Sequence, residues 1–161
     1  MNQISADLKF HLESLSMKIL NILRESEYGF LVADVSLTPR STCRINIEDL
    51  SGEHDTQLKM KYFAPWKSFI VQSVLFENRR QGTMTKILDL IKSQANECQI
   101  DKIVIESVLS PEMSHCALKN GFKVDESSGG YIDVKSFFEE NSEKETIFGG
   151  NYVYRVKRWI N

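Results

Sequence analysis

The residues best suited to chemistry lie in one short segment, residues 74–85, which reads Val-Leu-Phe-Glu-Asn-Arg-Arg-Gln-Gly-Thr-Met-Thr. Arg79 and Arg80 carry forked donors that match phosphate oxygens. Gly82 has no side chain, so a ligand can approach the backbone closely. This composition predicts an anion site, best matched to a phosphate or a pyrophosphate. The alternative is a solvated basic turn that caps a helix.

The elements on either side of this segment favour the anion site. Residues 69–76 form an apolar run typical of a buried strand, and residues 84–95 have the spacing of an amphipathic helix. A helix that begins just after Gly82 leaves its first N–H groups without partners, and its dipole adds partial positive charge there. Thr83 and Thr85 can each add a hydroxyl.

The pattern downstream of this helix predicts a crossover. Residues 102–109 indicate another strand, so a strand, a helix and a strand follow one another and the two strands are expected to be parallel. A second helix is expected from Pro111 to Asn120, with Gly121 as a left-handed cap at its end.

The remaining segments complete a mixed sheet. Ser5 is expected to cap an N-terminal helix. Helical spacing predicts that this helix covers residues 4–25. Alternation of apolar and polar residues predicts strands over 30–37, 43–48, 57–63, 122–124, 131–134 and 152–159. The polar, acidic composition of residues 139–146 predicts an exposed loop. The fold class is therefore α+β, with a mixed, mostly antiparallel sheet flanked by helices and a central parallel strand–helix–strand unit. The length predicts a single domain over 1–161.

Composition excludes several classes of protein. The 20 basic and 22 acidic residues give a net charge of −2, which argues against a protein that mainly neutralises nucleic acid. No apolar run approaches the roughly 18 residues of a membrane span. The three cysteines, Cys43, Cys98 and Cys116, are a poor disulfide framework, so a reducing cytoplasm is expected. No zinc motif, P-loop or Gly-x-Gly-x-x-Gly fingerprint occurs, and no metal is expected.

Residues 79–84, Arg-Arg-Gln-Gly-Thr-Met, resemble the acetyl-CoA loop Arg/Gln-x-x-Gly-x-Gly/Ala of the GNAT superfamily of N-acetyltransferases. The strand and helix that follow, and then Gly121-Phe122, also resemble the family pattern. The resemblance covers residues 66–126, and the strand at 152–159 fits the family's usual ending. It implies a GNAT-like fold and acetyl-CoA as co-substrate.

The resemblance also implies how the cofactor is held. Backbone groups near Val74 would bind the pantetheine arm, and the amides of residues 81–85 with the Thr85 hydroxyl would bind the pyrophosphate. Met84 stands where the family has Gly or Ala; its spacing predicts a side chain in the core, and the alternative is that it crowds the phosphates. The expected cofactor-binding residues are Val74, Arg79, Arg80, Gln81, Gly82, Thr83, Met84 and Thr85.

The catalytic residues are less well defined by the pattern. The position of the family's usual acid, a Tyr, is Ala117, so Ser114, Cys116, Tyr152 or Tyr154 are candidate substitutes. Glu106 lies in an apolar strand, where burial or a partner would tune a base; the alternative is that it points outward. The candidate catalytic residues are thus Glu106, Ser114, Cys116 and Tyr154. For Trp66, core or edge packing is favoured over lining a substrate mouth.

The resemblance implies transfer of an acetyl group from acetyl-CoA to a primary amine on a small molecule, a peptide N-terminus or a lysine. The alternatives are a catalytically silent GNAT-like domain that binds acyl-CoA or a protein, and an anion-binding module without CoA. The expected partners are an amine acceptor, either small molecule or protein, with no membrane and no nucleic acid; the chain is expected to be a cytoplasmic monomer or homodimer.

Overall fold

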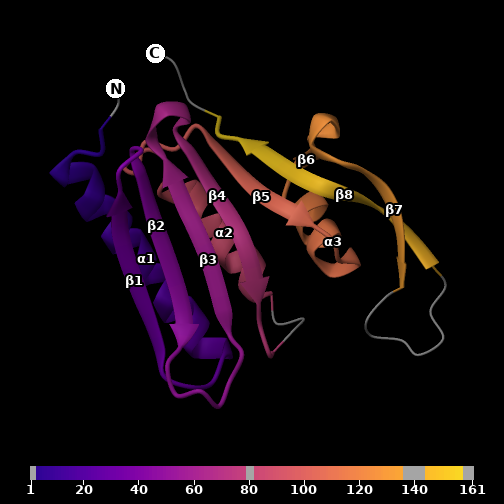
Figure 1. Ribbon diagram of the computed structural model, residues 1–161, viewed down its shortest axis with the longest axis horizontal. Helices are drawn as coiled ribbons and strands as arrows, with labels where there is room; N and C mark the ends of the chain where they lie inside the picture. The colour runs from indigo at the N-terminus through magenta and orange to yellow at the C-terminus, as the bar shows by residue number, and fades with distance from the viewer. Residues whose placement is uncertain (1–2, 79–81, 136–143, 158–161) are drawn as a thin grey trace.

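A single twisted sheet organises the molecule, and two helices lie behind its first four strands in Figure 1. The computed structural model describes residues 3–78, 82–135 and 144–157. The strands follow the order β1-β2-β3-β4-β5-β8-β6, and β7 pairs with β8. Their bounds are β1 Leu31–Thr38, β2 Thr42–Asp49, β3 Gln57–Phe63, β4 Ser68–Leu75, β5 Lys102–Val108, β6 Lys123–Val124, β7 Gly130–Lys135 and β8 Lys144–Arg155. The helices are α1 Ala6–Ser26, α2 Thr83–Ser93 and α3 Pro111–Lys119, with short 3-10 turns at Ala64–Trp66 and Glu126–Ser128.

Helix α1 forms because its first turn is capped and one face is apolar. The Ser5 hydroxyl accepts a hydrogen bond from the Leu8 amide at 3.0 Å, as predicted. Buried side chains then recur along the helix at Leu8, Leu12, Leu15, Ile19 and Leu23. This apolar face packs on β1 and β2 and beside α2. The Thr83 hydroxyl lies 3.0 Å from the Ser26 hydroxyl, so the end of α1 lies next to the start of α2.

Strands β1 to β4 form the predicted antiparallel meander. Alternate residues of β2 and β3, such as Ile45 and Met60, are fully buried under the helices. The residues between them, such as Arg44 and Lys61, therefore point to the opposite face. We call that opposite face of β1–β5 the open face, because no helix among the described residues covers it.

Strands β4 and β5 are parallel, which confirms the predicted crossover, but they pair over only four residue pairs, from Ser68↔Lys102 to Val71↔Ile105. Beyond these pairs, β4 is irregular opposite Lys59/Met60 and β5 shifts register between Ile105 and Val108. The two strands then diverge toward their C-terminal ends (Figure 1). We call this divergence the fork.

The predicted fold class is confirmed: the sheet is mixed and mostly antiparallel, with one parallel pair. The boundaries of the C-terminal part were predicted less well. The final strand was expected over 152–159, and residues 139–146 as a loop. Instead β8 begins at Lys144 and runs through Gly149 and Gly150, whereas residues 139–143 of the expected loop lie outside the described residues. A Cβ on Gly150 would lie 2.8 Å from Phe148 and Ser128 side-chain atoms, so this glycine serves close packing within the strand.

Candidate functional site

The N-terminus of α2 opens directly after the fork. Gly82 occupies the position before the helix with φ 70°, a left-handed conformation that favours glycine. The Lys86 amide bonds back to the Gly82 carbonyl at 3.0 Å, so the amides of residues 83–85 have no partner within the helix. Gly82 is exposed, and apart from its chain neighbours no described residue has an atom within 4 Å of the position of a Cβ there. An anion can therefore approach these amides along the helix axis.

The side chains of this turn face different neighbours. Met84 is 7% exposed and packs in the core, as its spacing predicted, so it does not crowd the turn. The Thr83 hydroxyl is turned toward α1 and lies 3.0 Å from the Ser26 hydroxyl. The half-buried Thr85 hydroxyl accepts a hydrogen bond from the side-chain Nδ2 of Asn120 at 3.1 Å. The predicted ligand-binding residues Arg79, Arg80 and Gln81 lie outside the described residues.

Val74 lies on β4 past the last pair with β5. It pairs with Leu58 of β3 on one edge, and its half-buried side chain packs against the core. Within the described strands, the β4–β5 ladder ends at Val71, so the other backbone edge near Val74 has no strand partner. This edge has the unpaired donors and acceptors that an extended ligand arm requires.

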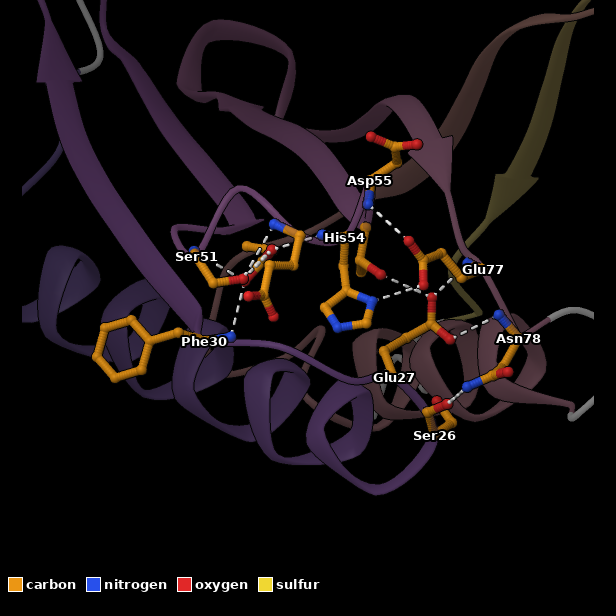
Figure 2. Close-up of polar contacts among 11 residues, drawn as sticks. Ser26, Glu27, Phe30, Ser51, His54, Asp55, Glu77 and Asn78 are labelled. Atoms are coloured by element: carbon orange, nitrogen blue, oxygen red, sulfur yellow. Dashed lines mark hydrogen bonds and ion pairs between the residues drawn. The ribbon is translucent and has the colours of Figure 1, made fainter.

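A buried carboxylate ties the start of the β4–α2 connection to the end of α1 (Figure 2). Glu27 is 5% exposed and accepts hydrogen bonds from the backbone amides of Glu77 and Asn78, at 2.6 and 2.8 Å. The Thr56 hydroxyl donates a third, at 2.9 Å. The Asn78 side chain also donates to the Ser26 carbonyl. Sequence reasoning missed Glu27, because a carboxylate just after a helix reads as an exposed turn residue.

The β2–β3 loop is tied to the same connection. The Glu77 carboxylate accepts from the Asp55 amide and contacts His54 Nδ1, both at 2.8 Å. The hydrogen bond from the Asp55 amide, and then the one with His54, lower the pKa of Glu77. The same contact with Glu77 raises the pKa of His54. Asp49 orders the base of the loop: bonds from Ser51, and then from the Phe30 and His54 amides, hold the pKa of Asp49 well below its usual range.

The candidate catalytic residues are not gathered at one point. Ser114 is 3% exposed and its hydroxyl lies 2.7 Å from the Tyr152 hydroxyl, which donates to the Phe148 carbonyl. Tyr154 packs against Phe122, with the Lys92 ammonium 4.2 Å from the centre of its ring. These contacts give both Tyr152 and Tyr154 structural partners inside the fold.

Cys116 is the one predicted catalytic residue that lies beside the α2 turn. It is half-buried on α3, with Sγ 3.9 Å from the Thr85 hydroxyl and 3.6 Å from the Asn120 side-chain nitrogen. The other two cysteines, Cys43 and Cys98, are buried, and burial raises the pKa of each thiol to about 11. Neither of those two thiols is therefore a nucleophile near neutral pH.

Glu106 lies apart from these residues, half-buried on the open face. It lines a groove of about 630 Å³ that crosses the sheet from the β1–β2 turn to the fork. The groove lining is Thr38, Pro39, Arg40, Thr42, Arg44, Lys61, Phe63, Trp66, Ile70, Gln72 and Glu106. Trp66 is 68% exposed, so it lines this groove rather than packing in the core. The cationic part of the lining was missed, because its residues come from separate strands and show no motif.

In the described part of the chain, no three His, Cys, Asp or Glu side chains gather where they could hold a metal ion. None of the helices there is both long enough and apolar enough to cross a bilayer.

The chain is similar to several solved acetyltransferase structures. A nourseothricin acetyltransferase aligns with a TM-score of 0.45 and 11% identity, over 80% of this chain and 86% of that one. A probable GNAT-family acetyltransferase from Chromobacterium violaceum aligns with a TM-score of 0.41 and 12% identity, over 71% of this chain and 58% of that one. A dodecameric spermidine N-acetyltransferase from Vibrio cholerae aligns with a TM-score of 0.39 and 14% identity, over 88% of each chain.

No protein-family model and no curated protein sequence matches this chain.

Proposed function

We propose that this chain is a single-domain N-acetyltransferase over residues 1–161, which transfers the acetyl group of acetyl-CoA to a primary amine. The observation that carries the proposal is the pairing of two features at one place. Strands β4 and β5 separate after four residue pairs, and α2 is the next helix along the chain, with three amides that have no partner within the helix behind an exposed left-handed glycine.

Each feature suits a different part of acetyl-CoA. The amides of residues 83–85, with Arg79, Arg80 and Gln81, would hold the pyrophosphate, since the helix dipole and forked donors both favour an anion. The open edge of β4 near Val74 would bond the amide-rich pantetheine arm. Because Met84 is in the core and no described residue beyond its chain neighbours lies within 4 Å of a Cβ position on Gly82, the described part of the turn has room for the phosphates.

The reaction would take place where the strands separate. The amine nitrogen forms a bond to the acetyl carbon, the carbon–sulfur bond breaks, and the thiolate leaves with the electron pair. The proton that the amine gives up balances the thiolate. Backbone N–H groups at the fork can stabilise the oxyanion that develops on the acetyl oxygen. Cys116 and Glu106 are the candidate proton-transfer groups that remain accessible, whereas Ser114 is held by Tyr152.

A catalytically silent acyl-CoA-binding domain is the second candidate. The buried Ser114–Tyr152 contact favours it, because two of the hydroxyls that might protonate the thiolate are already engaged with each other and with Phe148. The two candidates agree on binding and differ on turnover.

Binding and thiol release separate these possibilities. Acetyl-CoA in excess should raise the Tm of the chain, because it binds only the folded state. Release of free CoA thiol with a panel of primary amines should then identify the enzyme. A Tm shift without thiol release from any amine would favour the silent domain, and no shift at high excess would overturn both.

Charge-removing variants test where the pyrophosphate lies. The double variant Arg79→Ala/Arg80→Ala should weaken CoA binding roughly 10- to 100-fold and leave binding of pantetheine, which lacks the pyrophosphate, nearly unchanged. The control Lys144→Ala/Lys157→Ala removes two charges from exposed positions at the two ends of the described C-terminal segment. Equal losses for CoA and pantetheine would contradict the proposed phosphate role.

A further inference from the structure

The groove on the open face carries like charges in direct opposition. Arg44 of β2 and Lys61 of β3 are cross-strand partners. Both line the groove, with Arg40 from the β1–β2 turn beside them. Like charges directly opposite one another destabilise a sheet pair, so the arrangement is costly unless an anion lies between them. Among the described residues, none of these three cations takes part in an ion pair.

The opposite end of the groove carries a carboxylate. Lys61 of β3 pairs with Ile70 of β4, and Ile70 pairs with Val104 of β5. Glu106 lies two residues farther along β5 than Val104. It also lies beyond the last β4–β5 pair, so it faces the fork. Since neighbouring strands are about 4.8 Å apart, the backbones of β3 and β5 are separated by about 10 Å. The groove is thus polarised over the length of a small molecule, with cations at one end and an anion at the reactive end.

An aromatic wall lines the groove near its cationic end. Phe63 and Trp66 make an edge-to-face contact at 5.0 Å, and the Lys102 ammonium lies 5.5 Å from the centre of the Trp66 ring. Trp66 nevertheless keeps 68% of its surface exposed. An exposed indole beside charged side chains is a surface on which the carbon skeleton of a small polar ligand can pack.

We propose that this groove binds the amine substrate, and that the substrate is a small primary amine carrying an anionic group, either a carboxylate or a phosphate. The anionic group binds Arg44 and Lys61, with Arg40 at the rim, while the amine points to Glu106 at the fork. This inference rests on the proposed acetyl transfer. It disfavours polyamines, because a lining of three cations and one carboxylate repels a second and third ammonium group.

Matched pairs of amines that differ only in the anionic group test the substrate class. We would compare phosphoethanolamine with ethanolamine, glucosamine 6-phosphate with glucosamine, and β-alanine with β-alaninamide, and include spermidine as the polycation. Binding is followed by the fluorescence of Trp66, with Trp66→Phe as the blank, and turnover by thiol release. The anionic member of at least one pair should bind at least about tenfold more tightly than its uncharged partner. The phosphate and carboxylate pairs show which group is preferred.

Three variants locate the site. Arg44→Gln/Lys61→Gln should raise Kd and KM for the anionic amine roughly 10- to 100-fold, with little change in kcat or in the KM for acetyl-CoA. Lys59→Gln is the matched control, because Lys59 is exposed on the same strand but does not line the groove. Glu106→Gln should weaken charged and uncharged amines alike.

The outcomes separate this inference from the proposed function. Thiol release that is fastest with spermidine, or unchanged in Arg44→Gln/Lys61→Gln, overturns the substrate class while acetyl transfer stands. Anionic-amine binding without thiol release supports the groove and overturns the transferase. If the anionic and uncharged members of every matched pair bind equally well, the inference is overturned, whether or not acetyl-CoA binds.

Discussion

The polar groups around the start of the β4–α2 connection and those of the open-face groove are arranged in opposite ways. At the connection, the buried carboxylate of Glu27 receives three donors, and Glu77 receives two. In the groove, Arg44 and Lys61 oppose each other, and the described residues supply them with no ion-pair partner. Polar groups with hydrogen-bond partners stabilise one conformation. Like charges that face each other without an ion-pair partner lower stability and favour binding of an anionic ligand.

The contrast suggests a division of roles. The network of Glu27, His54, Asp55, Glu77 and Asn78 fixes where the chain enters the α2 turn, and we call it the anchor. The anchor would preorganise the cofactor site, and the groove would select the acceptor. If so, damage to the anchor should affect stability and acetyl-CoA binding, and leave the selectivity of the groove intact.

The largest expected effect comes from Glu27→Ala. It removes the acceptor for the Glu77 and Asn78 amides and the Thr56 hydroxyl in a buried position, so the free energy of unfolding should fall by roughly 3 kcal/mol. The Tm should fall by roughly 6–12 °C. Denaturant unfolding measures the loss as a lower midpoint with an unchanged slope.

Two controls accompany this variant. Glu25→Ala removes an exposed carboxylate two residues earlier and should change stability by less than about 0.5 kcal/mol. Glu27→Gln keeps one acceptor oxygen and should lie between the wild type and Glu27→Ala. At a temperature where it is folded, Glu27→Ala should bind acetyl-CoA more weakly and still distinguish anionic from uncharged amines. Loss of that distinction would break the proposed division of roles.

The sequence predicted the elements of this comparison better than the contacts between them. Local signals located α1, the β4–α2–β5 crossover and the cap at Ser5, because capping and periodicity depend on neighbouring residues. Glu27, Glu77 and Arg44 gave no local signal. Glu27 meets Asn78 across 51 positions, and Arg44 meets Lys61 only once the β2–β3 register is fixed. Such sites depend on tertiary pairing, which a periodic pattern does not specify.

A second prediction compares two left-handed glycines, Gly82 before α2 and Gly52 in the β2–β3 loop. Each has a positive φ, of 70° and 78°, and among the described residues beyond its chain neighbours a Cβ on either would meet no atom within 4 Å. Gly82→Ala and Gly52→Ala should therefore each lower the free energy of unfolding by about 1 kcal/mol, through backbone strain alone. Only Gly82→Ala should weaken acetyl-CoA binding, by about tenfold or more, because its methyl group occupies the path to the helix amides.

Calorimetric titration with acetyl-CoA, paired with denaturant unfolding, measures both effects. Gly52→Ala serves as the control for strain, since it matches the conformation and the open surroundings of Gly82. If both variants bind acetyl-CoA like the wild type, the turn at Gly82 is a plain helix cap and the cofactor site lies elsewhere.

The smallest expected effect is the pH dependence of the His54–Glu77 contact at the edge of the anchor. The hydrogen bond to Glu77 raises the pKa of His54 in the folded state. The contribution of His54 to the stability of the fold is therefore fully present below its unfolded pKa of about 6.5, and it is lost as pH rises through the raised value. The pKa of Glu77 is lowered, so its contribution is present above about 4.3 and is lost as pH falls through the lowered value. The contact therefore stabilises the fold most between these limits, in mildly acidic solution.

His54→Gln tests this window. The Tm difference between the wild type and His54→Gln should be largest near pH 6 and shrink by about 2 °C or less toward pH 9, because the pair is partly exposed. His11→Gln, on α1 and away from the β2–β3 loop, should keep the wild-type profile. A difference that grows with pH would mean that His54 is held in its neutral form, and Glu77 would then be fixed by the Asp55 amide alone. Since Glu77 would keep that backbone bond in either case, acetyl-CoA affinity should change far less in His54→Gln than in Glu27→Ala.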